Sequence, residues 1–265
     1  MDLLQVILLA IIQGITEFLP ISSSGHLILV PHFLGWLDQG LAFDAAIHVG
    51  TLAAIVLYFR RQLGQMTTAW VGSVLRKERT PDSRLAWAVL WGTIPVGLVG
   101  LFFSDYIEAN FRNPLLVAGT LSFFGVVLWV ADRLGSRDRD EYSIGWRDVA
   151  LIGTAQAMAL VPGTSRSGIT MTAGLSLGLT REAAARFSFL LAVPGTTLAA
   201  FYEIWKMMRA TVPIDWTAVI IGVVVAAVSG LLCIHFLLRF IQRIGMAPFA
   251  IYRLLLAAVI AYVFM

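Results

Sequence analysis

Long apolar runs separated by short polar loops dominate this 265-residue chain. Six of the runs reach the roughly 20 residues that a helix needs to cross the ~30 Å hydrocarbon layer of a membrane. They cover about residues 41–59, 84–103, 115–132, 185–204, 217–238 and 247–264. The pattern predicts an all-α polytopic membrane protein in which six spanning helices belong to a single integral membrane domain, residues 1–265.

Two further apolar segments, 1–34 and 148–180, are interrupted in the middle by clusters of Pro, Gly and Ser. The interruptions are LPISSSGH in the first segment and VPGTSRSG in the second. Irregular backbone at membrane depth is stable only where protein or a water-filled cavity satisfies its amide groups. We therefore expect two re-entrant helix–loop–helix hairpins in addition to the six spans.

The two interrupted segments also resemble one another. A shift of 143 residues places Gln13 on Gln156 and Ser22 on Ser165. The similarity continues beyond the loops, because the later stretch HVGTLAA matches VPGTTLAA at nearly the same shift. Chance similarity between two small-residue loops is the alternative, but the continued match favours an internal repeat.

The number of spans between the hairpins sets the direction of this repeat. Three predicted spans separate them, and an odd number of crossings delivers the second hairpin to the opposite membrane face. The sequence therefore predicts an inverted-topology repeat with halves of about 1–132 and 148–265. Broken segments in such repeats bring their polar groups together near the midplane, so we expect the two loops to form one site.

Composition agrees with a membrane protein, since 58% of the residues are hydrophobic and 13% are charged, against about 25% charged in soluble domains. A net charge of +3 could indicate nucleic-acid binding. The basic residues instead occupy short loops between apolar runs, where they act as topology signals. We expect no nucleic-acid partner.

The loop charges alternate along the chain. Loops 60–84, 133–147 and 239–246 carry six, four and two Lys or Arg, whereas loops 104–114 and 206–216 carry one and two. Because positive loops stay on the cytoplasmic side, both termini are predicted outside. The first hairpin would then enter the membrane from outside and the second from inside.

The first loop concentrates polar groups. Gln13 and Glu17 are four residues apart and share a helix face. A charged residue near the bilayer centre costs about 2.5 to 3.5 kcal/mol on insertion scales, so Glu17 is either functional or lies near the surface, and the adjacent loop favours function. The serines and imidazole needed for nucleophilic or acid–base chemistry follow at once. These residues are Ser22, Ser23, Ser24 and His26.

The second loop, PGTSRSG, surrounds Arg166 with small hydroxyl residues at the start of a half-helix. A guanidinium fork, hydroxyl donors and free backbone amides suit a phosphate. Arg166 is therefore a candidate catalytic residue. The candidate substrate-binding residues are Gln13, Ser22 and Ser24 in the first segment, Thr164, Ser165 and Ser167 in the second, and Arg253. Another intramembrane arginine, Arg253, could pair with Glu17, extend the phosphate site or reach the membrane surface, and the sequence leaves these three possibilities open.

No other residues carry a comparable signal. His32, His48 and His235 lack neighbours that argue for chemistry, so we interpret them as structural. No phosphate-binding Gly-rich motif, dinucleotide fingerprint, His/Cys metal cluster or GxSxG motif occurs in the sequence. The predicted chemistry is therefore confined to the two loops.

These motifs resemble those of the undecaprenyl pyrophosphate phosphatases of the bacitracin-resistance type. QGITEFLPISSSGH and PGTSRSG match the two signatures of that family, and FSFLLAVP and PFAIYR are also similar to it. The resemblance covers essentially the whole chain. It implies a multi-pass hydrolase of the bacterial inner membrane that removes the terminal phosphate of undecaprenyl pyrophosphate, returns the lipid carrier to cell-wall synthesis and confers bacitracin resistance.

By the resemblance, the active-site positions are Glu17, Ser22, Ser23, His26, Ser165 and Arg166. The first acidic position of the family pattern is Gln13 here, which is a poor base or metal ligand, so a carboxylate role would fall on Glu17. The resemblance also implies an outward-facing site.

The expected mechanism uses both loops. Arg166 and the second loop would hold the pyrophosphate, while Ser23 attacks with His26 as its proton acceptor. Glu17 would orient His26 or hold a divalent cation, Mg or Ca. Attack by water in place of Ser23 remains open, as does replacement of Ser23 by Ser22 or Ser24.

Two other classes of function fit parts of the pattern. Broken helices in inverted repeats are typical of transporters, so a transporter or flippase of polyprenyl phosphate is the alternative, and a non-catalytic binder of anionic lipids is a weaker one. A nucleophile and a base beside the anion site favour hydrolysis. The partner is expected to be a polyprenyl pyrophosphate lipid within the membrane, and the sequence leaves a homodimer possible.

Overall fold

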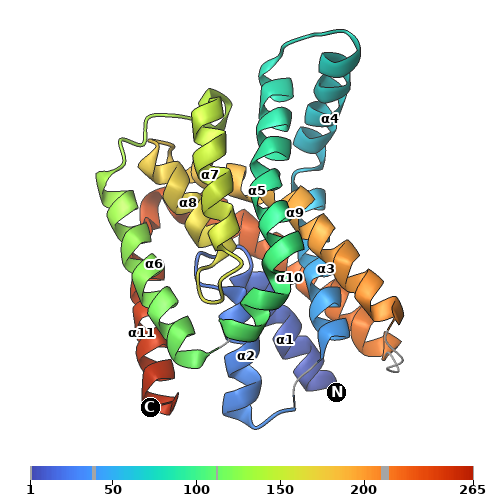
Figure 1. The fold of residues 1–265 in the computed structure, drawn as a ribbon, viewed down its shortest axis with the longest axis vertical. Coiled ribbons are helices and arrows are strands. Elements are labelled where there is room, and N and C mark those ends of the chain that lie inside the picture. The colour runs from blue at the N-terminus through green and yellow to red at the C-terminus, as the bar shows by residue number, and fades with distance from the viewer. Residues whose placement is uncertain (1, 38–39, 112, 210–214, 265) are drawn as a thin grey trace.

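The computed structural model describes residues 2–37, 40–111, 113–209 and 215–264. Helices account for most of these residues, and no β-strand occurs within them; an isolated bridge joins Arg139 and Leu179. Both chain ends lie at the same end of the molecule (Figure 1). The prediction of an all-α chain is confirmed.

Eleven α-helices and one 3-10 turn lie in the described part of the chain. They are α1 (Leu3–Thr16), α2 (Ser23–Leu34), α3 (Leu41–Tyr58), α4 (Arg60–Leu75), α5 (Pro81–Asn110), α6 (Pro114–Leu134), the turn Glu141–Ser143, α7 (Trp146–Met158), α8 (Arg166–Ser176), α9 (Arg181–Arg209), α10 (Trp216–Ile244) and α11 (Ala247–Phe264).

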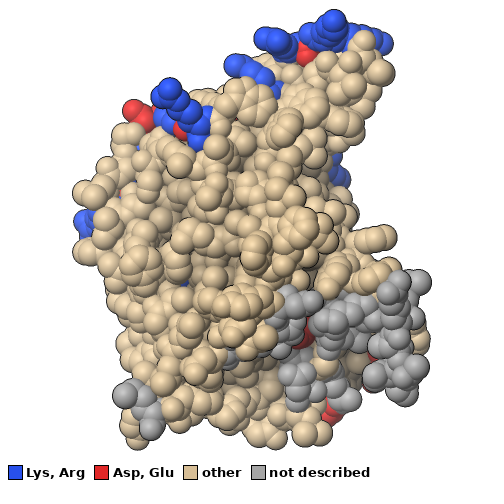
Figure 2. All heavy atoms as spheres, in the orientation of Figure 1, with Lys and Arg blue, Asp and Glu red and all other residues tan. Residues whose placement is uncertain are grey.

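Five of these helices, α5, α6, α9, α10 and α11, are long and apolar enough to cross a membrane. A sixth span results if α3 and α4 are counted together, although the chain bends by 78° between them. Lys and Arg gather at the end of the molecule opposite the chain ends, and the middle of the visible face is mostly uncharged (Figure 2). The prediction of a multi-pass membrane protein is confirmed, with five or six candidate spans.

The two interrupted segments form pairs of short helices, α1 with α2 and α7 with α8. A proline lies in each connection, Pro20 in the first and Pro162 in the second. Proline lacks the N–H that a continuing helix requires and restricts the residue before it. Each second helix begins after a serine with left-handed backbone, Ser22 at φ 73° and Ser165 at φ 70°.

Helix packing holds these short helices inside the molecule. α1 lies along α10 and α7 lies along α5, while α3 packs against both α10 and α9. On the far side of the connections, α6 packs against α8 and α11. The polar turns of the two interrupted segments therefore lie in the interior, while α1 and α7 each keep one face exposed, with Leu4 at 59% and Leu151 at 57%.

Ion pairs join the segment between α6 and α7 to its surroundings at the basic end of the molecule. Arg139 donates to Asp148 at 2.6 Å and Arg186 donates to Glu141 at 2.7 Å. Burial alone would raise the pKa of Asp148, but hydrogen bonds from Arg139 and the Gly145 N–H outweigh it and lower the pKa below its usual value. Asp148 is therefore held as a charged partner at the start of α7.

Gly14 allows α1 to approach α10 closely, so we expect Gly14→Ala to destabilise the protein. An added Cβ would lie 2.8 Å from the Ala226 carbonyl and 2.9 Å from the Gly230 nitrogen, and would also overlap the Ser229 hydroxyl. Backbone atoms cannot move aside without separating the helices, which typically costs about 1 to 3 kcal/mol.

Thermal unfolding of the detergent-purified variant measures this loss. The control is Gly64→Ala in α4, where an added Cβ meets no atom within 4 Å. An unchanged unfolding temperature in Gly14→Ala would show that the α1–α10 contact is looser than described.

Candidate active site

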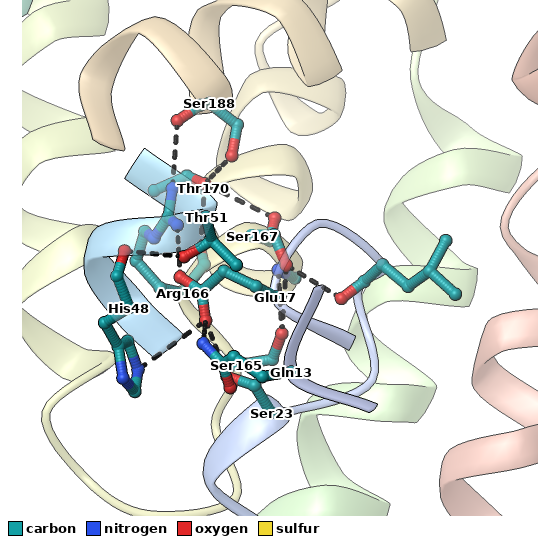
Figure 3. A network of polar contacts seen from close by, with 12 residues as sticks. Gln13, Glu17, Ser23, His48, Thr51, Ser165, Arg166, Ser167, Thr170 and Ser188 are labelled. Atoms are coloured by element: carbon teal, nitrogen blue, oxygen red, sulfur yellow. Dashed lines mark hydrogen bonds and ion pairs between the residues drawn. The ribbon is translucent and has the colours of Figure 1, made fainter. Parts of the chain in front are cut away.

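The turns of the two interrupted segments meet in the interior, although about 140 residues of sequence separate them. The Ser167 hydroxyl donates to the Leu19 carbonyl at 2.9 Å, and Arg166 reaches Glu17 (Figure 3). The site is therefore assembled from both halves of the chain.

Glu17 lies at the centre of this polar cluster. Its Oε1 accepts a hydrogen bond from Arg166 Nη2 at 2.6 Å. Its Oε2 accepts from the Ser23 hydroxyl at 2.7 Å and from Gln13 Nε2 at 3.2 Å. The side chains of Glu17 and Arg166 are 10% and 18% exposed. This pairing compensates both charges, which would otherwise be costly to bury.

The first turn determines which serine contacts the carboxylate. Ser22 has left-handed backbone and precedes α2, so Ser23 becomes the first residue of that helix and directs its hydroxyl to Glu17. The Ser22 and Ser24 hydroxyls lie 3.3 Å from each other. Of the three serines considered from sequence, Ser23 is the one with a hydrogen bond to Glu17.

His26 is held by two other partners. Its Nδ1 lies 2.7 Å from the Ser22 carbonyl, and its Nε2 lies 2.6 Å from the Tyr252 hydroxyl. A carbonyl only accepts, so Nδ1 carries the hydrogen, and a neutral ring then accepts from Tyr252 at Nε2. No hydrogen bond joins His26 to Ser23 among the described contacts, and the proton-acceptor role of His26 stays a prediction.

Tyr252 was not identified from sequence. Its ring stacks on that of His26 with centroids 5.6 Å apart. It belongs to the PFAIYR stretch, but a tyrosine in an apolar helix carries no local sign of its partner.

His48 of α3 also lies beside the cluster. Its Nε2 is 4.0 Å from Glu17 Oε2, and its Nδ1 lies 2.7 Å from the Asp44 carbonyl. From the sequence, His48 was interpreted as structural, because its neighbours in the chain do not argue for chemistry. Only the packing of α3 beside α1 brings it near Glu17 (Figure 3).

The second turn fixes Arg166 from several sides. Arg166 Nη1 donates to the Ser188 carbonyl of α9 at 3.3 Å, and Thr170 contacts the Ser188 hydroxyl at 2.7 Å. Ser165 caps α8 by accepting from the Gly168 N–H at 3.1 Å. The guanidinium therefore lies at the N-terminus of α8, where helix amides also favour an anion.

Three buried side-chain atoms have no hydrogen-bond partner among the described residues. One of them, Trp70 Nε1, lies elsewhere in the molecule, and the other two lie at this site. They are Gln13 Oε1 and Thr164 Oγ1, and both residues are fully buried. Buried polar groups are usually satisfied, and an exception in a native structure calls for an explanation. Both residues were predicted to bind substrate, a role that stays a prediction.

Arg253 connects the backbones of the two turns. Its side chain is fully buried, and its guanidinium donates to Gly163 and Thr164 carbonyls at 2.9 and 3.0 Å and to the Pro20 carbonyl at 3.4 Å. A further bond reaches the Leu121 carbonyl of α6 at 3.1 Å. The sequence left three roles open for Arg253, and none of them included hydrogen bonds to these backbone carbonyls. We call this arrangement the carbonyl clamp. The predicted substrate contact of Arg253 stays untested.

Replacing Arg253 with methionine should unfold the protein more easily and disorder both turns. The change leaves the buried Pro20, Gly163 and Thr164 carbonyls of the two turns without the Arg253 donor, and one unsatisfied buried group costs about 1 to 3 kcal/mol. We expect a fall of at least about 3 kcal/mol in unfolding free energy. Arg253→Lys should recover only part of it, because one ammonium cannot reach the carbonyls of both turns.

Chemical denaturation followed by tryptophan fluorescence gives the comparison. Arg239→Met on α10, which removes an exposed arginine near Phe240, serves as the control. Equal stability of Arg253→Met and Arg239→Met would contradict the clamp.

The donor set also bears on metal binding. Within the residues that the structure describes, no group of three or more His, Cys, Asp or Glu could hold a metal ion. Both Glu17 oxygens already accept hydrogen bonds. A cation at this site would have to take most of its ligands from a bound phosphate, as Mg²⁺ commonly does.

The cluster can perform one kind of chemistry well. A serine hydroxyl bonded to a carboxylate is the geometry of a nucleophile with its base, and the adjacent guanidinium and helix N-terminus suit a phosphoryl group. The fold and the site together define a multi-pass membrane protein with an interior serine–carboxylate–arginine site.

The family model for the bacitracin resistance protein BacA matches residues 6–259. Similar curated proteins include "Undecaprenyl-diphosphatase 2" of Stutzerimonas stutzeri, 56% identical over 100% of this chain and 99% of its own length. "Undecaprenyl-diphosphatase" of Nitrosococcus oceani is 52% identical over the full length of both chains, and that of Thioalkalivibrio sulfidiphilus is 53% identical over the same share. The chain belongs to the BacA family.

Proposed function

We propose that this chain is a membrane phosphatase that hydrolyses undecaprenyl pyrophosphate to undecaprenyl phosphate and phosphate. The Ser23–Glu17–Arg166 arrangement is the observation that carries the proposal, because it joins a nucleophile, its base and an anion clamp. The names of the full-length relatives support the substrate. The product would return to cell-wall synthesis, and its recycling would confer bacitracin resistance.

The proposed reaction has two steps. Arg166 and the first amides of α8 bind the terminal phosphoryl group and stabilise its charge. The Ser23 oxygen attacks the terminal phosphorus, its proton passes to Glu17, and the bridging P–O bond breaks to release undecaprenyl phosphate. Water then attacks the phosphoserine; Glu17 directs the proton transfers, Ser23 recovers its hydrogen and phosphate leaves.

His26 has a different role in this proposal from the one expected from sequence. Because its ring nitrogens bond the Ser22 carbonyl and Tyr252, it would support the turn that carries Ser23, and Glu17 would act as the base. A requirement for Mg or Ca stays a prediction, and no step above depends on it. Carrying a lipid would need only the anion clamp, so the Ser23–Glu17 bond favours hydrolysis over transport.

We also infer that the two interrupted segments are re-entrant hairpins of an inverted repeat with halves of about 1–132 and 148–265. Local geometry supports this: Ser22 and Ser165 share the same unusual backbone region, and the Ser22–Ser24 and Ser165–Ser167 hydroxyl distances are both 3.3 Å. Packing supports it too, because α1 lies along α10 as α7 lies along α5.

The proposed location is the bacterial inner membrane, with both termini outside and an outward-facing site. The basic residues at the end opposite the chain ends support this orientation (Figure 2). The side chains of Arg112, Lys206 and Arg209, which belong to the comparison of loop charges, lie outside the described residues. A homodimer stays a prediction.

Ser23→Ala tests the nucleophile directly. We expect phosphate release from undecaprenyl pyrophosphate in detergent to fall by about 10³-fold or more, since removal of a covalent nucleophile leaves only binding and charge stabilisation. Acid-quenched wild type should carry phosphate on the peptide containing Ser23, as measured by mass spectrometry. Ser24→Ala is the matched control and should stay within a few-fold of wild type.

Each other outcome has a distinct meaning. Near-normal release by Ser23→Ala, without a phosphopeptide in wild type, would replace Ser23 by water as the nucleophile. No release from folded wild type supplied with Mg²⁺ or Ca²⁺ would contradict the phosphatase function.

A further inference from the structure

His48 of α3 presents an open ring nitrogen to the carboxylate of the active site. Its Nδ1 lies 2.7 Å from the Asp44 carbonyl. A carbonyl only accepts, so in the neutral ring Nδ1 carries the hydrogen and Nε2 is an acceptor. No hydrogen bond to this Nε2 occurs among the residues that the structure describes, and the atom faces Glu17 Oε2 at 4.0 Å (Figure 3). Two acceptors therefore face each other across a gap.

The gap has the dimensions of a water site. Its 4.0 Å width exceeds the length of a hydrogen bond, and a polar contact of this length is commonly bridged by water. A water oxygen about 2.8 Å from both atoms would make an angle of about 90° with them, close to the angle between the two hydrogens of water. The side chain of His48 is 37% exposed and that of Glu17 is 10% exposed, so solvent reaches the gap from the His48 side.

The carboxylate oxygen at this gap also bonds the nucleophile. The Ser23 hydroxyl donates to Glu17 Oε2 at 2.7 Å. A water that bonds the same oxygen lies within about 5.5 Å of the Ser23 oxygen, by the sum of two hydrogen-bond lengths. When Ser23 carries a phosphoryl group, this distance allows the water oxygen to come within the roughly 3 to 3.5 Å of phosphorus at which attack begins. The gap therefore lies beside the bond that the second step must break.

The second step of the proposed reaction requires a base other than Glu17. In the first step Glu17 takes the Ser23 proton, so it enters the second step as a neutral carboxyl group. That group can return its proton to the Ser23 oxygen, but it cannot accept another proton from water. Both ring nitrogens of His26 already have hydrogen-bond partners. The open Nε2 of His48 is the base that the geometry supplies.

We propose that His48 is the base of the second step and that the hydrolytic water lies between His48 Nε2 and Glu17 Oε2. The inference rests on the proposed function, which supplies a phosphoserine at Ser23. The water oxygen bonds phosphorus as the Ser23 Oγ–P bond breaks. One proton of the water passes to His48 Nε2, and the proton held by Glu17 passes to Ser23 Oγ. His48 then gives its proton to the departing phosphate or to solvent, and the site returns to its starting state.

His48→Leu tests the proposal, because leucine can neither accept a hydrogen from water nor take a proton. Phosphoserine is formed from undecaprenyl pyrophosphate labelled in its terminal phosphate, excess unlabelled substrate is added, and the loss of label from acid-quenched protein is followed. We expect this loss to be about 10²-fold slower than in wild type, the lower end of what a positioned base contributes. Formation of phosphoserine, measured by quenched flow, should change less than about threefold, because this step uses Glu17 and Arg166.

His48→Gln separates holding the water from taking its proton. The glutamine side-chain oxygen accepts a hydrogen from water but takes no proton at neutral pH. Loss of label should therefore be about tenfold slower than in wild type, between wild type and His48→Leu. The matched control is His235→Leu on α10, which replaces an exposed histidine whose ring contacts Tyr58 and Phe236. Both rates should stay at the wild-type value in this control.

The outcomes separate this inference from the proposed function. Loss of label at the wild-type rate in His48→Leu overturns the inference, and so does an equal slowing of formation and loss, which a purely structural role of His48 would give. Wild type that hydrolyses the substrate without forming phosphoserine also overturns it, because no second step then exists, while the phosphatase function stands. Failure of wild type to release phosphate would instead contradict the phosphatase function itself.

Discussion

Arg166→Ala is expected to lower kcat/KM for undecaprenyl pyrophosphate by about 10³- to 10⁵-fold, the range found when an arginine that stabilises a transferring phosphoryl group is removed. Arg166 is positioned for this role by Ser188 on one side and by its place in the first turn of α8. Because the site is shielded from bulk water, the electrostatic attraction between the Arg166 guanidinium and the phosphoryl oxygens is stronger than it would be in water. Phosphate release in detergent, with substrate concentration varied, measures the loss.

The conservative change separates charge from geometry. Arg166→Lys keeps the positive charge but loses the planar fork that can bond Glu17 and a phosphate together, so we expect about a 10²-fold loss. Removing Arg166 also leaves Glu17 without its ion-pair partner. The double variant Arg166→Met with Glu17→Gln should therefore unfold at a higher temperature than Arg166→Met alone, while remaining inactive. Activity within tenfold of wild type in Arg166→Ala would contradict the assigned clamp.

Glu17→Gln should produce a comparable loss, about 10³-fold in kcat, together with loss of the phosphopeptide at Ser23. Glutamine has nearly the same shape and can still accept a hydrogen bond from Ser23, but it cannot take the serine proton at neutral pH. The structure offers Ser23 no other described carboxylate partner, since its hydroxyl bonds Glu17 Oε2. Quenched-flow measurement of phosphoserine formation isolates this step from product release.

A matched control for Glu17→Gln exists in the same chain. Glu141 also pairs with an arginine, Arg186, at 2.7 Å, and its side chain is 10% exposed like that of Glu17. Glu141→Gln should lower stability with kcat unchanged, because Glu141 lies outside the polar cluster. If Glu17→Gln instead kept normal phosphoserine formation, His26 or His48 would have to be considered as the base.

The apolar runs and the two interruptions were informative because they depend on local physics. A run of about 20 apolar residues forms a helix in a membrane whatever its neighbours are, and five or six such helices are present. The Pro, Gly and Ser clusters end helices for equally local reasons, and they mark the turns at Pro20 and Pro162. Of the residues named as candidates in these turns, Gln13, Ser23 and Arg166 hydrogen-bond Glu17, and the roles of all the candidates stay predictions.

Side-chain partners were much harder to anticipate. The sequence paired His26 with Ser23 because they are close in the chain, yet His26 bonds Tyr252, which lies 226 residues away. Arg253 was considered for Glu17 or phosphate, but its donors reach backbone carbonyls of three segments. His48 was interpreted as structural because its neighbours in the sequence do not argue for chemistry, and the packing of α3 places it 4.0 Å from Glu17.

The sequence by itself determined the class of protein, the helices and the two turns that hold the reactive groups, because hydrophobic length and helix breaking are properties of short segments. Only the tertiary structure decided that Glu17 bonds Ser23 and Arg166 at once. A hydrogen bond needs its donor and acceptor within about 3 Å. Such a distance between residues far apart in the chain is set by how the helices pack.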